Sequence, residues 1–211
     1  MTAAFTSPLP IAVLISGGGT TLRNLIERQQ HDELPIDLRL VISSSPTAKG
    51  LQFAADTGIQ SLVIEKKKKD SPADYERAMF EPCRAAGVQY VVMAGFLKHV
   101  PIPADFENRV INIHPSLIPA FCGQGMYGLK VHQAVIDYGA KITGCTVHFV
   151  DNQYDHGPII GQWPVPVRDD DTAETLQARV FAAECEAYPA VLRALAAGQI
   201  SATGRRISWL R

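Results

Sequence analysis

The run Ile11-Ala-Val-Leu-Ile15 leads directly into Ser16-Gly-Gly-Gly19 and then into Thr20-Thr-Leu-Arg-Asn-Leu-Ile-Glu-Arg28. A short, continuous apolar run is typical of a buried strand, and the apolar residues after the glycines recur at helical spacing. This stretch therefore predicts a strand, a glycine loop and a helix.

The alternation of predicted strands and helices continues through the first half of the chain. Strands alternating with helices are typical of a parallel sheet, so we predict an α/β fold with a doubly wound, mostly parallel sheet and helices on both faces. The further strands are expected at Leu38–Ile42, Ser61–Ile64 and Tyr90–Ala94, and the further helices at Ala48–Thr57 and Pro72–Ala86.

The second half contains a long loop, His114–Gly128, which is rich in glycine and proline. Loops of this length inside a compact domain are usually functional or mobile, so this one is expected to border a site. Around it we predict strands at Val110–Ile113, Cys145–Val150 and Pro158–Val167, a helix at Val131–Tyr138, a helix from a capping box at Asp171–Glu174 to Ala197, and an edge strand within Ile200–Trp209.

Length and composition limit the class of protein. A chain of 211 residues fits one α/β domain, which we place at residues 11–211 after a loose arm at residues 1–10. A net charge of -1 and a hydrophobic fraction of 46% favour small-molecule partners over nucleic acid. The sequence shows no signal peptide and no membrane-spanning run, so we expect a cytoplasmic protein.

The four cysteines and six histidines do not have the spacing of metal ligands. The cysteines also lack a Cys-x-x-Cys pair, and we expect free thiols and no metal.

Asn112 and His114 stand one residue apart where the strand Val110–Ile113 gives way to a proline-rich loop. Residues i and i+2 of a strand share a face, so the carboxamide and the imidazole point the same way. Acyl transfer needs a donor for a developing oxyanion and a group that carries a proton. The pair therefore predicts a catalytic site, although a lone histidine at a strand end is more often structural.

Asp155 lies in the turn Tyr154-Asp-His-Gly-Pro158. Aspartate and glycine are ordinary turn formers, so a structural role is the simpler interpretation. If the turn folds over Asn112 and His114, the carboxylate holds the imidazole charged and oriented. His148 is interpreted as a core histidine, and the lysines at 66–69 as a solvated loop.

The glycine loop offers free backbone N–H groups and the positive end of the helix that begins at Thr20, which suit a phosphate. The spacing is neither Gly-x-Gly-x-x-Gly nor a Walker loop, so the motif alone leaves the alternatives of phosphate binding and simple turn geometry open.

With these residues assembled, the chain resembles the folate-dependent phosphoribosylglycinamide formyltransferase (GAR transformylase) family from about Ile11 to Trp209. The motifs are Asn112-Ile-His-Pro-Ser-Leu-Ile-Pro119, the preceding Met93-Ala-Gly-Phe96 and the later Val147-His-Phe-Val150 and Asp155-His-Gly-Pro158. The resemblance implies a Rossmann-like formyltransferase fold and formyl transfer from 10-formyltetrahydrofolate to glycinamide ribonucleotide (GAR) in purine (IMP) biosynthesis.

The resemblance also implies the roles of individual residues, in a monomer or homodimer without a metal. The catalytic residues are Asn112, His114 and Asp155. GAR is expected to contact Gly18, Gly19, Thr20, Thr21, Gly95 and Glu184. The folate is expected to contact Leu97, Lys98, His99, Val100, Asn112, Asp151, Asn152, Gln153, Tyr154 and Asp155.

Three features depart from the family pattern. Thr21 stands where an asparagine is usual, the loop Ala120–Lys130 is longer than usual, and the family's arginine near the folate tail has no counterpart in Asp70-Ser-Pro-Ala-Asp-Tyr75. The alternatives are formyltetrahydrofolate deformylase and methionyl-tRNA formyltransferase. We expect neither, because the first usually carries an N-terminal regulatory domain and the second a C-terminal RNA-binding module.

Overall fold

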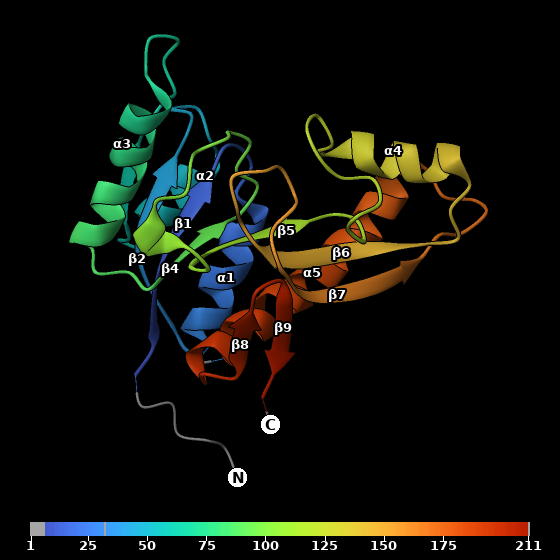
Figure 1. Cartoon of the computed structure of the whole chain (residues 1–211). Coiled ribbons are helices and arrows are strands. Elements are labelled where there is room, and N and C mark those ends of the chain that lie inside the picture. Colours follow the sequence, from blue (N-terminus) through green and yellow to red (C-terminus); the bar gives the residue numbers. More distant parts are fainter. Residues whose placement is uncertain (1–6, 32, 211) are drawn as a thin grey trace.

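The structure is a computed structural model that describes residues 7–31 and 33–210. Its main sheet has seven strands in the order β3-β2-β1-β4-β5-β6-β7 (Figure 1). The strands β3, β2, β1, β4 and β5 are parallel, whereas β5 to β6 and β6 to β7 are antiparallel. The strands are β1 (Leu9–Ile15), β2 (Ile36–Ser43), β3 (Gln60–Val63), β4 (Tyr90–Met93), β5 (Val110–His114), β6 (Ile142–Phe149) and β7 (Ile159–Pro166).

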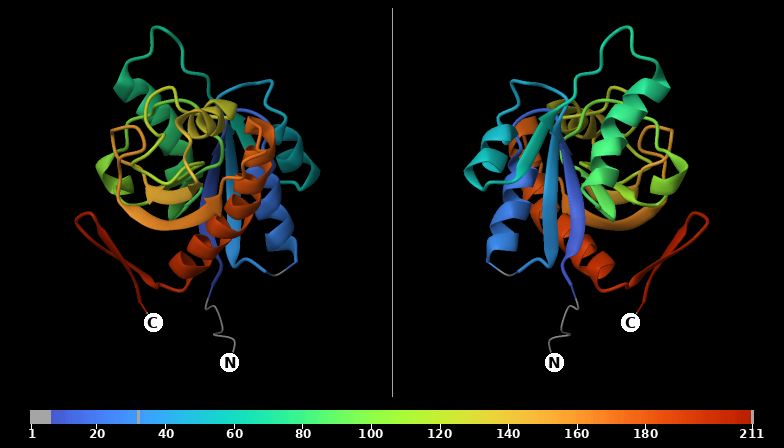
Figure 2. Two further views of the ribbon diagram at one scale, coloured as in Figure 1. Left: turned by 90° about the vertical axis from the view of Figure 1, so that its right-hand side faces the viewer. Right: turned by 90° about the vertical axis from the view of Figure 1, so that its left-hand side faces the viewer.

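Helices cover both faces of this sheet, so the predicted fold class is confirmed (Figure 2). Three of them, α1, α2 and α5, lie on one side, and α3 lies on the other. No helix in the described ranges is both long and apolar enough to cross a bilayer. The helices are α1 (Thr20–Gln30), α2 (Gly50–Asp56), α3 (Pro72–Ala85), α4 (Leu129–Tyr138), α5 (Ala173–Ala196) and the short 3-10 helix η1 (Ala104–Phe106).

Strand β1 shows how alternation produces two cores. Ile11, Val13 and Ile15 belong to the core beneath α1 and α5. Ala12 and Leu14 belong to the opposite core, where α3 contributes Tyr75, Met79 and Phe80. Because successive side chains of a strand point to opposite faces, a run that is apolar at every position fits a strand covered on both sides.

The predicted start of the first strand and the predicted cap of the last helix both change in the structure. β1 begins at Leu9, so the expected loose arm is wrong for residues 9 and 10, and residues 1–6 of that arm lie outside the described residues. The α5 cap is Thr172, which exchanges hydrogen bonds with Thr175, one residue later than the predicted Asp171–Glu174 box.

The C-terminal segment is not an edge strand of the main sheet. It forms a separate hairpin of β8 (Ile200–Thr203) and β9 (Arg206–Trp209). Gly204, at φ +58°, turns the chain between the two strands. Trp209 Nε1 donates to the Ile160 carbonyl of β7 over 2.8 Å and fastens the hairpin to the sheet.

Strand order reverses between β1 and β4, because the chain proceeds outward from β1 through β2 to β3 and then returns to the other side of β1. In open α/β sheets, ligands bind beyond the carboxyl ends of the strands at such a point. The Leu97 amide donates to Ser16 Oγ over 2.8 Å, which joins the loop after β4 to the loop after β1.

Candidate active site

A cavity of about 540 Å³ opens beyond the carboxyl ends of β1, β4 and β5. A volume of this size suits a small organic ligand. The structure brings most of the sequence-predicted site residues to its wall. These are Thr20, Thr21, Gly95, Leu97, Lys98, His99, Val100, Asn112, His114, Asp151, Gln153, Tyr154, Asp155 and Glu184.

The remaining predicted contacts lie away from the wall. Gly19 lies at the N-cap of α1 with φ +72°, and a Cβ there would be 2.4 Å from the Gly50 Cα. The glycine is therefore required by the close approach of α1 and α2. Gly18 precedes it in the same loop, and Asn152 uses its Oδ1 to accept from the Ile102 amide over 2.8 Å.

Asn112 is oriented by a histidine that sequence reasoning placed in the core. His148 is buried, and its Nδ1 lies 2.8 Å from the Phe149 carbonyl oxygen. A carbonyl oxygen only accepts, so Nδ1 carries the proton and Nε2 is left as an acceptor. Asn112 Nδ2 lies 3.2 Å from that Nε2 and must donate to it. This bond fixes which end of the carboxamide is the donor and leaves its second N–H free.

His148 also faces the acidic group of the site, with Nε2 3.9 Å from Asp155 Oδ1. Burial lowers the pKa of His148, and the Phe149 carbonyl and Asp155 oppose this effect. The pairing of Asn112 with His148 across β5 and β6 could have been predicted only with the strand register in hand.

His114 lies at the end of β5 and is 4% exposed. Its Nε2 lies 2.9 Å from the Phe121 carbonyl oxygen and donates to it. Its Nδ1 lies 3.5 Å from Asp155 Oδ2. Both nitrogens thus face acceptor oxygens, which fix the orientation of the ring.

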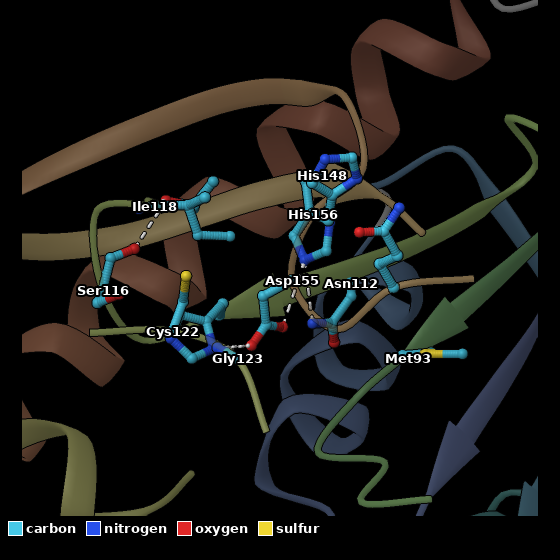
Figure 3. Close-up of polar contacts among 12 residues, drawn as sticks. Met93, Asn112, Ser116, Ile118, Cys122, Gly123, His148, Asp155 and His156 are labelled. Atoms are coloured by element: carbon cyan, nitrogen blue, oxygen red, sulfur yellow. Dashed lines mark hydrogen bonds and ion pairs between the residues drawn. The ribbon is translucent and has the colours of Figure 1, made fainter. Parts of the chain in front are cut away.

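Asp155 is brought to the other two residues by the turn between β6 and β7. Its Oδ2 also accepts from the Gly123 amide over 2.8 Å, so the carboxylate joins this turn to the long loop (Figure 3). Asp155 has φ +49°, a left-handed conformation that costs energy for a residue with a Cβ. Its side chain is 12% exposed, so the charge is largely removed from solvent.

The long loop borders the cavity, as predicted. Its cavity-lining residues are His114, Pro115, Gly123, Gly125, Met126, Tyr127 and Gly128. The loop contains the Ile118–Pro119 peptide bond, which is cis, a point that the sequence left open.

One face of α5 forms another wall that sequence reasoning found only at Glu184. Burial raises the pKa of the Glu184 carboxyl to about 8. The residues of this face recur at the three- and four-residue spacing of a helix, which the sequence shows. Nothing in the sequence, however, indicated that this face lines a cavity. The lining residues of α5 are Glu174, Gln177, Ala178, Phe181 and Glu184.

His132 of α4 was also missed. It is 1% exposed and lines the cavity, and its Nδ1 has no hydrogen-bond partner in the described parts of the chain. Burial first, and then the nearby His114, lower the pKa of His132 to about 4. The imidazole is therefore neutral near pH 7 and offers the cavity an uncharged polar group.

Within residues 7–31 and 33–210, no group of three or more His, Cys, Asp or Glu residues could hold a metal ion. The polar groups around Asn112, His114 and Asp155 instead hydrogen-bond one another or backbone groups. The arrangement has the parts that acyl transfer requires, namely a fixed amide donor and an imidazole beside a carboxylate.

Comparison with known proteins shows the family to which the chain belongs. Residues 9–192 match the family model described as Formyl transferase, so the chain belongs to the formyl transferase family. Among its relatives is the chloroplastic phosphoribosylglycinamide formyltransferase of Vigna unguiculata, which is 41% identical over 191 residues, or 88% of this chain and 60% of the relative. The Bacillus subtilis phosphoribosylglycinamide formyltransferase is 32% identical, with 87% of this chain and 93% of the relative covered.

Solved structures give the same result. Glycinamide ribonucleotide transformylase 1 of Symbiobacterium toebii has a TM-score of 0.90 and 37% identity over 99% of this chain and 96% of that one. A formyltetrahydrofolate deformylase of Burkholderia mallei, at 24% identity and a TM-score of 0.85, shares the fold. The chain spans about 60% of the length of the two plant relatives, at 60% and 64%.

Proposed function

We propose that this protein transfers the formyl group of 10-formyltetrahydrofolate to the amine of GAR. The observation that carries the proposal is the convergence of Asn112, His114 and Asp155 on one cavity whose far wall includes Thr20 at the start of α1. A helix N-terminus favours an anion, which suits the phosphate of a ribonucleotide. The similarity to phosphoribosylglycinamide formyltransferases supports the same reaction.

The reaction forms a bond between the amine nitrogen and the formyl carbon and breaks the bond from that carbon to N10 of the folate. One proton leaves the amine, and one arrives at N10. The intermediate carries an oxyanion, which the free N–H of Asn112 and the protonated ring of His114 stabilise. The His114–Asp155 pair, 3.5 Å apart, is the acid–base group that moves the proton.

Two further parts of the cavity contribute binding. Glu184, kept neutral at pH 7 by burial, can both donate to and accept from a ribose hydroxyl. Backbone groups of the segments 97–100 and 151–155 hold the folate ring. In place of the usual asparagine, Thr21 offers a hydroxyl to the phosphate.

The proposal is tested by measuring the release of the deformylated folate product from 10-formyl-5,8-dideazafolate by ultraviolet absorbance, with and without GAR. Strictly amine-dependent release of the folate product is the expected result. Equal turnover without the amine would mean that water is the acceptor, and the protein would be a deformylase.

The Asn112→Ala variant tests the assigned oxyanion donor. Removal of one such donor typically lowers turnover by about 10²- to 10³-fold. The midpoint of thermal unfolding is expected to change little, because Asn112 is only half-buried. Turnover within a few-fold of the unmodified protein would remove Asn112 from the mechanism.

A further inference from the structure

The turn that carries Asp155 is contacted from outside the site by Arg205. This arginine lies at the tip of the β8–β9 hairpin, beside the loop between β6 and β7 (Figure 1). Its Nη2 donates to the His156 carbonyl oxygen over 2.6 Å. Its Nη1 lies 3.3 Å from both ring nitrogens of His156, so the guanidinium lies against the imidazole. One side chain thus contacts both the main chain and the ring of the residue after Asp155.

His156 extends this contact into the turn. Its Nδ1 lies 2.7 Å from Asp151 Oδ2, and Asp151 Oδ1 accepts from the Gln153 amide over 2.8 Å. Arg205, His156 and Asp151 therefore form a continuous set of contacts that runs from the hairpin to the cavity wall, which Asp151 lines. Figure 3 shows His156 close to Asp155 and His148.

The turn needs such support because its backbone is constrained. Asp155 has φ +49°, and strain of this kind persists only where the surrounding structure enforces it. At Gly157 a Cβ would lie 1.9 Å from the Phe149 carbonyl oxygen, so the chain passes there without room for a side chain. His156 lies between these two positions, and its carbonyl is the group that Arg205 holds.

The β8–β9 hairpin that carries Arg205 is itself held in place by two hydrogen bonds. Trp209 Nε1 donates to the Ile160 carbonyl, and the Leu210 amide donates to the Gln199 carbonyl over 2.7 Å. The first bond fixes β9 to β7, which begins just after the turn. The second bond ties the end of β9 to the residue before β8.

We propose that Arg205 is a positioning residue, which holds the main chain at His156 and thereby keeps the Asp155 carboxylate in place against His114. Arg205 does not touch the cavity wall, so it acts through the turn and not on a substrate. The proposal rests on the assignment of Asp155 to formyl transfer.

The neighbouring Arg206 provides a matched control. It lies in β9, carries the same charge, is exposed, and makes no side-chain hydrogen bond or ion pair with the residues that the structure describes. The variants for comparison are therefore Arg205→Ala, Arg205→Lys and Arg206→Ala.

We expect Arg205→Ala to lower kcat for formyl transfer by about 5- to 20-fold. This is at or below the roughly 10- to 150-fold equivalent of one charge-assisted hydrogen bond, because Arg205 acts on the transition state only through the turn. The KM for the amine substrate is expected to stay within twofold, because the side-chain contacts of Arg205 are to His156 and not to the residues expected to bind GAR. Arg205→Lys retains a cationic donor to the His156 carbonyl and is expected to recover part of the loss. Arg206→Ala should match the unmodified protein.

Amide hydrogen exchange measures the turn without reference to activity. Faster exchange across residues 151–157 is expected in Arg205→Ala and not in Arg206→Ala, with the exchange of β5 unchanged. The proposal is overturned by unchanged exchange in Arg205→Ala, by faster exchange with normal kcat, or by equal effects in the two alanine variants. If the protein hydrolyses the formyl donor instead of transferring it, the proposed function fails while the exchange result stands.

Discussion

Glu184 makes the stability of the protein depend on pH. The carboxyl lies on α5 against the cavity, and burial raises its pKa from 4.5 to about 8. At pH values between these two limits, the unfolded chain has released the proton while the folded chain retains it. The folded state therefore binds more protons, and the free energy of unfolding falls as the pH rises from about 4.5 to about 8.

The size of the effect follows from the same pKa values. A change from 4.5 to about 8 sets a ceiling of about 5 kcal/mol. Glu184 is partly exposed at the cavity wall, and water in the cavity solvates its charged form. We therefore expect about 1–2 kcal/mol, well below the ceiling.

The isosteric variant Glu184→Gln removes the titration and keeps the shape of the side chain. Urea unfolding at several values between pH 4.5 and pH 9 gives the free energy of unfolding of both proteins. We expect the variant to gain about 1–2 kcal/mol relative to the unmodified protein across this range, with most of the gain complete by pH 8.

Glu186→Gln is the control for the loss of one negative charge, because Glu186 lies on the same helix and its side chain is 64% exposed. Its surface pair with Arg28 is expected to contribute at most about 1 kcal/mol, and its loss should not follow the pH between 4.5 and 8 as Glu184 does. A stability difference between Glu184→Gln and the unmodified protein that stays constant from pH 4.5 to pH 9 would refute the reasoning. It would mean that the Glu184 carboxyl ionises in the folded protein as it does in water.

Two further predictions concern the architecture around the site. Gly157→Ala places a Cβ 1.9 Å from the Phe149 carbonyl oxygen, so the turn that carries Asp155 must move. We therefore expect a lower midpoint of thermal unfolding and reduced formyl transfer. An unchanged midpoint with normal activity would contradict this. Asp171→Asn weakens the paired hydrogen bonds with Arg179 and should lower the free energy of unfolding by about 1–3 kcal/mol at pH 7 in urea. The Arg179 guanidinium holds the pKa of Asp171 well below its usual range, so this difference should shrink progressively as the pH falls below about 4. A difference at pH 2 as large as that at pH 7 would argue against it.

Much of the fold was predictable from local pattern. Buried parallel strands are apolar at every position and alternate with amphipathic helices, so each element of the main sheet was found with small errors at its ends. The errors arise where a tertiary contact outweighs a local signal. Asp171 looks like a helix cap, but Arg179 engages its carboxylate and Thr172 caps α5 instead.

The C-terminal segment shows the same limit. The run Ile200–Trp209 has the composition of one strand, and Gly204 divides it into a hairpin. Whether that hairpin joins the sheet depends on Trp209 and its bond to the Ile160 carbonyl, which no local pattern contains.

The sequence by itself determined that Asn112 and His114 share one face at the end of a strand, because alternation along a strand is a local property. Only the tertiary structure decided that Asp155 meets them, that His148 orients the Asn112 amide, and that Arg205 supports the turn from outside. These contacts join segments about 30 to 50 residues apart. Strand register and the packing of the hairpin produce them, and neither is encoded in any single stretch of the chain.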